Sequence, residues 1–150
     1  MSVQGTWEEF VAALCDLAVE YDAETYLYED VVLLSARKAK EGNVSCHIRV
    51  TRFDDESARI ETGWCFAMTR DFVADDRSRP VPALGVVEAI CAGNAEERCL
   101  VDAEGRWIGI QLEAWASNGD RWESQSGGFA GVARRIVRRF PRWNDPDGHS

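Results

Sequence analysis

The sequence predicts an α+β domain, an antiparallel five-stranded sheet with helices on one face. Three observations predict it. Runs with strand character follow one another with short turns between them, and amphipathic helical stripes stand near both ends of the chain. The length of 150 residues suits one domain, 1–150, that can bury its own core. The expected order of elements is α-β-β-β-α-β-β-α.

The first helix is expected from Thr6 to Tyr21. Thr6 is a suitable N-cap, and Glu9 three residues later completes a capping box. Trp7, Phe10 and Leu14 recur at helical spacing and are expected in the core.

Three strands are expected next, over 31–40, 44–53 and 58–69. In the second of them, Val44, Cys46, Ile48 and Val50 alternate with polar residues, as in a half-buried strand. Residues 41–43 and 54–57 have turn character, which favours an antiparallel meander. Gly63 is a candidate bulge within the third strand, and Trp64 is expected in the core.

The second half is expected to hold a helix, a hairpin and a final helix. A polar loop over 70–80 leads to a helix that starts near Pro82 and stops at Gly93-Asn94. Residues 98–103 and 106–116 form the expected hairpin, with Trp107 in the core, and 117–128 form a loop. The last helix is expected over 129–140, with Val132, Ile136 and Phe140 buried, and residues 143–150 as a mobile tail.

Charge and composition exclude some classes of function. The formal net charge is −9, and residues 1–34 hold eight acidic residues and no lysine or arginine. A negative surface repels phosphates and anionic lipid, so neither nucleic acid nor a membrane is the expected partner. The residues at the start, MSVQGTWEEF, do not resemble a signal peptide, and no apolar run is long enough to span a membrane, so we expect a cytoplasmic protein. The five cysteines lack zinc spacing, so we expect reduced thiols in the core.

No catalytic, cofactor-binding or metal-binding residue is assigned from the sequence. His47 lies on the polar phase of a strand, which is typical of a surface histidine. The stretch Ser124–Gly128 has the glycines of an anion-binding loop, but it lacks the lysine of a P-loop. The expected protein therefore has no cofactor, and its status as an enzyme stays open with a leaning against it.

The candidate partner-binding residues are tryptophans near element ends and arginines on one side of the expected last helix. Tryptophan and arginine are enriched where interfaces hold most of their binding energy, and an arginine face can bind acidic groups. The set comprises Trp115, Trp122, Arg134, Arg138, Arg142 and Trp143.

The segment CLVDAEGRWIGIQL (99–112), followed after a loop by the expected amphipathic helix, resembles the last hairpin and final helix of class I type III secretion chaperones and the related YbjN family. Small size, acidity and element order are also similar over most of the chain. The resemblance implies a non-enzymatic homodimer that binds an extended segment of another protein.

Three hypotheses of function follow. The first is a non-enzymatic protein-binding module, chaperone- or adaptor-like, that holds a protein partner through exposed aromatic and charged surface and forms a possible homodimer. The second is an immunity-type inhibitor whose acidic surface binds a basic toxin enzyme. The third is an enzyme with an unrecognised site in the concavity of the sheet.

Overall fold

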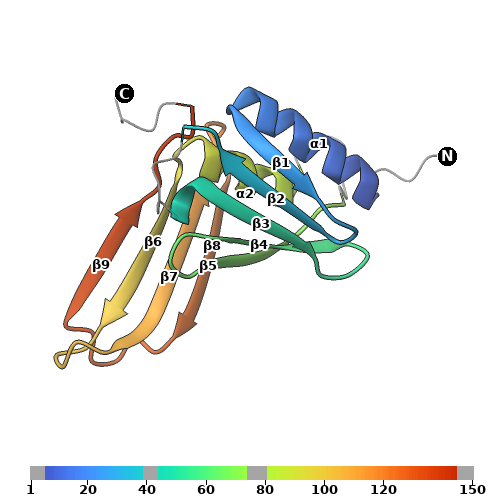
Figure 1. Cartoon of the computed structure of the whole chain (residues 1–150). Helices are drawn as coiled ribbons and strands as arrows, with labels where there is room; N and C mark the ends of the chain where they lie inside the picture. Colours follow the sequence, from blue (N-terminus) through green and yellow to red (C-terminus); the bar gives the residue numbers. More distant parts are fainter. Residues whose placement is uncertain (1–5, 39–43, 74–80, 145–150) are drawn as a thin grey trace.

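The structure, a computed structural model, describes residues 6–38, 44–73 and 81–144. Within them lie two α-helices, a short 3-10 helix and nine strands (Figure 1). Their bounds are α1 Trp7–Glu20, β1 Ala23–Leu27, β2 Val31–Ala36, η1 Val44–Cys46, β3 His47–Arg52, β4 Ser57–Thr62, β5 Phe66–Asp71, α2 Pro82–Cys91, β6 Ala95–Val101, β7 Trp107–Trp115, β8 Arg121–Gly127 and β9 Arg134–Arg139.

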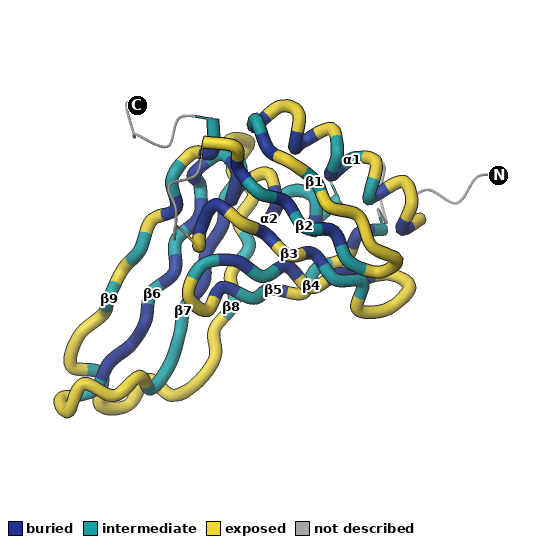
Figure 2. The backbone as a smooth tube through the Cα atoms, in the orientation of Figure 1, coloured by how far each residue is buried: buried dark blue, intermediate teal, exposed yellow. Residues whose placement is uncertain are grey.

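The strands form two antiparallel sheets. The first sheet is a five-stranded meander, β1-β2-β3-β4-β5, and both helices cover one of its faces (Figure 1). The α+β class and the five-stranded antiparallel sheet are therefore confirmed. The second sheet, in the order β8-β7-β6-β9, was not expected, and its far end projects away from the helices (Figures 1 and 2).

Helix α1 begins as its sequence predicts. The Thr6 side chain accepts a hydrogen bond from the Glu9 N–H, which satisfies a backbone donor at the helix start. Trp7 and Phe10 pack against Phe72, which follows β5, with ring centroids 5.5 Å apart in both pairs. Leu14, one turn beyond Phe10, is fully buried, so the predicted core stripe of this helix is confirmed.

Helix α2 lies where the two sheets meet. It starts at Pro82, as predicted, and Gly93 beyond its end adopts φ +79°, the left-handed conformation that glycine favours. The helix contacts β4 and β5 of the first sheet and β7 of the second. Val86, Val87 and Ile90 are fully buried there, so α2 contributes to one continuous core.

The expected last helix over 129–140 is wrong. Residues 134–139 form β9, which pairs with β6, and residues 121–127, expected as a loop, form β8. The run Arg-Arg-Ile-Val-Arg-Arg fits helical spacing, but β-branched Ile136 and Val137 favour a strand, and pairing along β6 satisfies the backbone. Of the residues expected to be buried here, Phe140 is buried, while Val132 and Ile136 are only partly so.

Other boundaries in the first sheet also differ. Strand β1 was missed, and the single strand expected over 58–69 is a hairpin formed by β4 and β5. Gly63 lies in its turn with φ +67°, so it reverses the chain instead of forming a bulge. Residues 41–43, expected as a turn, and most of the expected loop over 70–80 lie outside the described residues.

The exposure of three tryptophans is the opposite of what the sequence predicts. Trp64 and Trp107, expected in the core, are about half exposed, because Trp64 sits in a turn and Trp107 begins a strand at the projecting end. Trp143, expected at the start of a mobile tail, is fully buried. Its Nε1–H donates to the Ser45 carbonyl at 3.1 Å and its backbone N–H to the Cys91 carbonyl at 2.8 Å. Residues 145–150 lie outside the described part of the chain.

No disulfide joins the five cysteines in the structure. Cys46, Cys91 and Cys99 are buried, but Cys15 is half-buried and Cys65 is exposed, so the expectation that the thiols lie in the core holds only in part. Burial raises the pKa of the Cys91 thiol above its ordinary value, so this thiol is neutral at physiological pH. Among the described helices, neither has the length and apolar character needed to cross a membrane.

Candidate functional site

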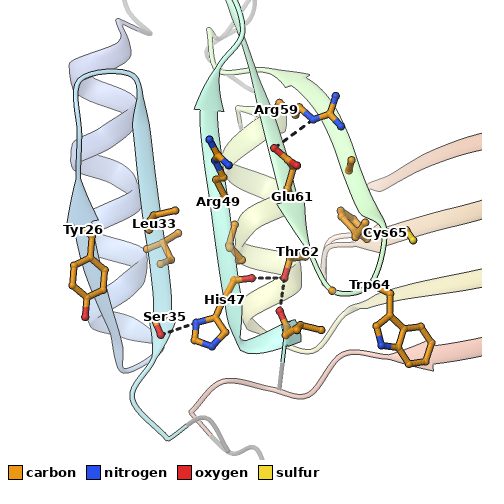
Figure 3. Close-up of a pocket in the computed structure, with 16 residues that line it drawn as sticks. Tyr26, Leu33, Ser35, His47, Arg49, Arg59, Glu61, Thr62, Trp64 and Cys65 are labelled. Carbon is orange, nitrogen blue, oxygen red and sulfur yellow. Dashed lines mark hydrogen bonds and ion pairs between the residues drawn. The ribbon is translucent and has the colours of Figure 1, made fainter. Parts of the chain in front are cut away.

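An open groove of about 680 Å³ lies on the face of the first sheet that the helices leave uncovered (Figure 3). Every strand of this sheet contributes to its lining, from Tyr26 on β1 to Ala67 on β5. In Figure 3, Tyr26 and Trp64 stand on opposite sides of the groove, with His47 and Arg49 between them. This groove is the candidate functional site.

The floor of the groove is a row of side chains that the strand register aligns. Tyr26 pairs with Leu33, Leu33 with Arg49, Arg49 with Glu61, and Glu61 with Ala67. Residues directly opposite each other on antiparallel strands point to the same face. The row therefore places aromatic, aliphatic, cationic and anionic side chains in sequence across the sheet.

The charges in the groove are not fully paired. Arg59 Nε lies 3.5 Å from Glu61 Oε1, so these two form an ion pair. Arg49 is exposed, and no hydrogen bond or ion pair joins its side chain to another described residue. A guanidinium of this kind presents its donors in a fork that matches a carboxylate. The groove thus carries an available positive charge in a protein whose net charge is −9.

Ser35 and His47 form a polar pair beside Arg49. They are register partners on β2 and β3, and Ser35 Oγ lies 2.9 Å from His47 Nδ1 (Figure 3). If the serine hydroxyl donates to Nδ1, the other ring nitrogen carries a proton that it can donate into the groove. At the β1 side of the groove, Tyr26 Oη donates to Glu24 Oε2 at 2.6 Å, which raises the pKa of this phenol.

Trp64 forms one rim of the groove and is held from behind by the second sheet. The backbone N–H groups of Trp64 and Cys65 donate to the two carboxylate oxygens of Glu97, at 2.9 and 3.1 Å. The guanidinium of Arg138 lies over the Trp64 ring, 4.3 Å from its centroid, and pairs with Glu97. A half-exposed indole is therefore held in a defined place, which lowers the entropy lost when a ligand packs on it.

The rim also carries a thiol. Cys65 is exposed as a residue. Partial desolvation of its thiol by neighbouring atoms, together with the nearby Glu97 carboxylate, raises the pKa of the thiol. The thiol is thus mostly neutral near pH 7, which is unlike the activated thiolate of a nucleophilic cysteine.

The tryptophans singled out in the sequence lie away from this groove. Trp115 is partly buried on the outer face of the second sheet, under the guanidinium of Arg139 at 4.7 Å. Trp122 is partly buried against α2, so closely that a Cβ added to Gly85 would lie 2.6 Å from its ring. Trp143 is fully buried in the core. These rings serve packing, and Trp143 in particular is not available as a surface anchor.

The arginines singled out in the sequence are likewise dispersed. Arg134 and Arg138 lie on β9, where they pair with Val101 and Glu97 of β6. Arg142 is exposed beyond that strand, and its Nε donates to Asn144 Oδ1 at 2.7 Å. The expectation that Arg138 and Arg142 lie one helical turn apart fails with the helix. Of the residues predicted to bind a partner, Arg138 alone contacts the groove, from beneath Trp64.

The outer face of the second sheet offers charges that satisfy each other. Arg98 lies 2.6 Å from Glu96 and 3.1 Å from Glu113, and Arg121 lies 3.6 Å from Glu113. A partner would have to break these pairs, so this face is a weaker candidate than the groove.

Sequence reasoning missed Leu33, Arg49 and Trp64 as members of one site. The alternation in β3 did place His47 and Arg49 on a polar face, which is the one signal that was present. The sequence pattern did not reveal the strand order. Strand β1 and the β4–β5 turn, neither of which was predicted, form the two sides of the groove.

No family model, curated protein or solved structure matches this chain. Within the described residues, no three His, Cys, Asp or Glu side chains are grouped so that they could hold a metal ion.

Proposed function

We propose that this chain is a non-enzymatic protein-binding module, chaperone- or adaptor-like, that holds an extended acidic segment of a partner protein in the groove of the first sheet. The observation that carries the proposal is Arg49, which has no side-chain partner among the described residues and is set between Leu33 on the floor and the rigidly held Trp64 at the rim. Interfaces combine such an aromatic anchor with a few placed polar groups.

The dimensions of the groove suit a short extended segment. Adjacent strands lie about 4.8 Å apart, so the width of five strands is roughly 19 Å. An extended chain advances about 3.3 Å per residue, so about six residues cover this distance. Apolar side chains of the segment would pack on Leu33 and Trp64, and a carboxylate would pair with Arg49.

A cytoplasmic location belongs to the same proposal. The five free thiols suit a reducing compartment, and the raised pKa values of Cys46, Cys65, Cys91 and Cys99 make those four poor candidates for oxidation.

The test is to select binders from a library of random nonapeptides displayed on phage. The selected peptides are then synthesised and titrated into the protein while its tryptophan fluorescence is recorded. We expect peptides with acidic and apolar residues. Arg49→Glu should weaken their binding by about 2 kcal/mol, roughly thirtyfold. The matched control is Arg135→Glu, the same charge reversal at an exposed strand position outside the groove.

Equal loss in the two variants would show that overall charge, and not the groove, determines binding. Selection of peptides without carboxylates would also contradict the proposal.

The Ser35–His47 pair favours one second candidate, a hydrolase in which His47 Nδ1 takes the Ser35 hydroxyl proton as Oγ attacks an ester carbonyl. Among the described residues, no carboxylate accepts a hydrogen bond from the other His47 nitrogen, and such a bond would orient the ring in a triad. Turnover of p-nitrophenyl acetate that is lost in Ser35→Ala would favour this candidate. Equal rates for the wild type and Ser35→Ala would remove it.

A further inference from the structure

A second exposed surface lies at the opposite side of the molecule from the second sheet. The β1–β2 and β3–β4 hairpins end side by side there, joined by the Arg52 N–H to the Asp30 carbonyl at 2.8 Å (Figure 1). The start of α1 reaches the same place, because Trp7 Nε1–H donates to the Glu29 carbonyl at 3.2 Å. We name this surface the tip and define it as residues 6–9, 27–30 and 52–56.

Three large apolar side chains are exposed at the tip. Leu27 is 55% exposed, Tyr28 63% and Phe53 65%, whereas Trp7 at the start of α1 is buried. Single exposed hydrophobic residues are common on protein surfaces, but a group of them at adjoining turns is a feature of interaction sites. Burying a tyrosine and a phenylalanine also removes two large aromatic surfaces from water.

The charged residues of the tip are almost all acidic. Its acidic residues are Glu8, Glu9, Glu29, Asp30, Asp54, Asp55 and Glu56, and its one basic residue is Arg52. Arg52 pairs with Asp55 at 3.1 Å and approaches Asp30 at 3.9 Å. Asp54 accepts hydrogen bonds from the turn that it closes.

Three of these carboxylates, those of Glu8, Glu29 and Glu56, form no hydrogen bond or ion pair within the described residues, although Glu8 also lies in the first turn of α1, where negative charge is favoured. Carboxylates crowded on one surface repel each other, and a positively charged partner relieves that repulsion while it is attracted from a distance. The tip therefore combines apolar anchors with unsatisfied negative charge.

We propose that the tip docks on the basic surface of another protein, with Tyr28 and Phe53 as apolar anchors and the surrounding carboxylates as the charged rim. This surface is separate from the groove, which carries the exposed Arg49 and is proposed to bind acidic segments. The opposite charge of the two surfaces makes their ligands distinguishable.

The experiment uses the same random peptide display on the full chain, now analysed for cationic sequences. We expect a second class of selected peptides that carry lysine or arginine together with apolar residues. The double variant Tyr28→Ser/Phe53→Ser should weaken their binding roughly thirtyfold, and raising the salt concentration should weaken it further.

Two controls separate the tip from its alternatives. Val19→Ser removes another exposed apolar residue, 83% exposed, on α1 about 18 Å along the helix from Trp7, and should leave cationic peptides bound. Arg49→Glu should weaken the binding of acidic peptides only. The proposal for the groove and the proposal for the tip can therefore fail independently of each other.

Failure to enrich cationic peptides, or equal binding by the double variant, would overturn the proposal. Light scattering at low salt gives a further outcome. If the wild type is a dimer and the double variant a monomer, the tip binds a second copy of this chain, and the proposal of a different basic partner is wrong.

Discussion

Glu97 of β6 and Arg138 of β9 are cross-strand partners, with Glu97 Oε1 and Arg138 Nη2 2.5 Å apart and the Glu97 side chain fully buried. The same carboxylate accepts the Trp64 and Cys65 N–H groups of the β4–β5 turn. One buried ion pair therefore ties the second sheet to the rim of the groove in the first.

Replacing one partner of this ion pair should destabilise the protein strongly. Arg138→Met leaves a fully buried carboxylate without its cation, which costs about 3–5 kcal/mol of unfolding free energy. Glu97→Gln should also destabilise the protein, because Arg138 Nε and Nη2 are buried and would lose their anionic partner. The double variant should be less destabilised than the sum of the single ones, as urea unfolding can measure. Strict additivity would mean that the two side chains do not stabilise each other.

Gly63 should tolerate no side chain. A Cβ there would lie 2.7 Å from Glu97 Oε1 and 2.9 Å from the Phe140 ring, and the residue has φ +67°. Gly105 is the matched control, with φ +82° and no atom within 4 Å of its Cβ position. Both alanine variants lose about 1 kcal/mol to the left-handed backbone. Gly63→Ala should lose clearly more in urea unfolding, and equal losses would exclude a packing constraint at the turn.

Trp143 should behave as a core residue although it lies near the end of the chain. Trp143→Ala removes a fully buried indole and its hydrogen bond to the Ser45 carbonyl, so we expect a loss of about 3–5 kcal/mol. Trp107→Ala, at a half-exposed position, should change stability by about 0.5 kcal/mol or less. Thermal unfolding of the two variants checks this contrast, and a similar effect of both would contradict the buried position of Trp143.

Stability should fall in acid partly through two turn aspartates. Hydrogen bonds from the Ser57 hydroxyl and nearby amides lower the pKa of Asp54, and the Arg106 N–H lowers that of Asp102. Because their folded pKa values are depressed, they stabilise the fold above their unfolded value near 3.9, and this contribution is lost as the pH falls below it. Asp54→Asn/Asp102→Asn should flatten the decline of stability between about pH 4.5 and 2.5. An unchanged slope would show that these turns contribute nothing to acid sensitivity.

Local signals in the sequence predict the first half of the fold better than the second. The capping box of α1, Pro82 at the start of α2 and the alternation in β3 are each determined by neighbouring residues, and all three are present. The segment 134–139 fits a helix or a strand equally well on its own spacing. Its pairing with β6, far away in the sequence, decides the outcome, and no local pattern reveals that partner.

The candidate site depends even more on long-range order. The sequence around Leu33 and around Arg49 predicts only that each residue lies on a strand. The register of β2 with β3 makes the two residues cross-strand partners. Trp64 has an apolar neighbourhood in the sequence, yet a contact with Glu97, 33 residues away, holds it at the surface. Tryptophan and arginine were the expected residue types, but their positions follow from strand order.

The most direct test of the central claim is residue-by-residue mapping of a bound acidic peptide by amide chemical shifts of the ¹⁵N-labelled protein. We predict that the largest changes occur at Ser35, His47, Arg49, Glu61 and Trp64, which line the groove. Strands β8 and β9 should change little, and Arg49→Glu should abolish the changes in the groove. Changes centred on the second sheet, or none at a saturating peptide concentration, would contradict a binding site on the first sheet.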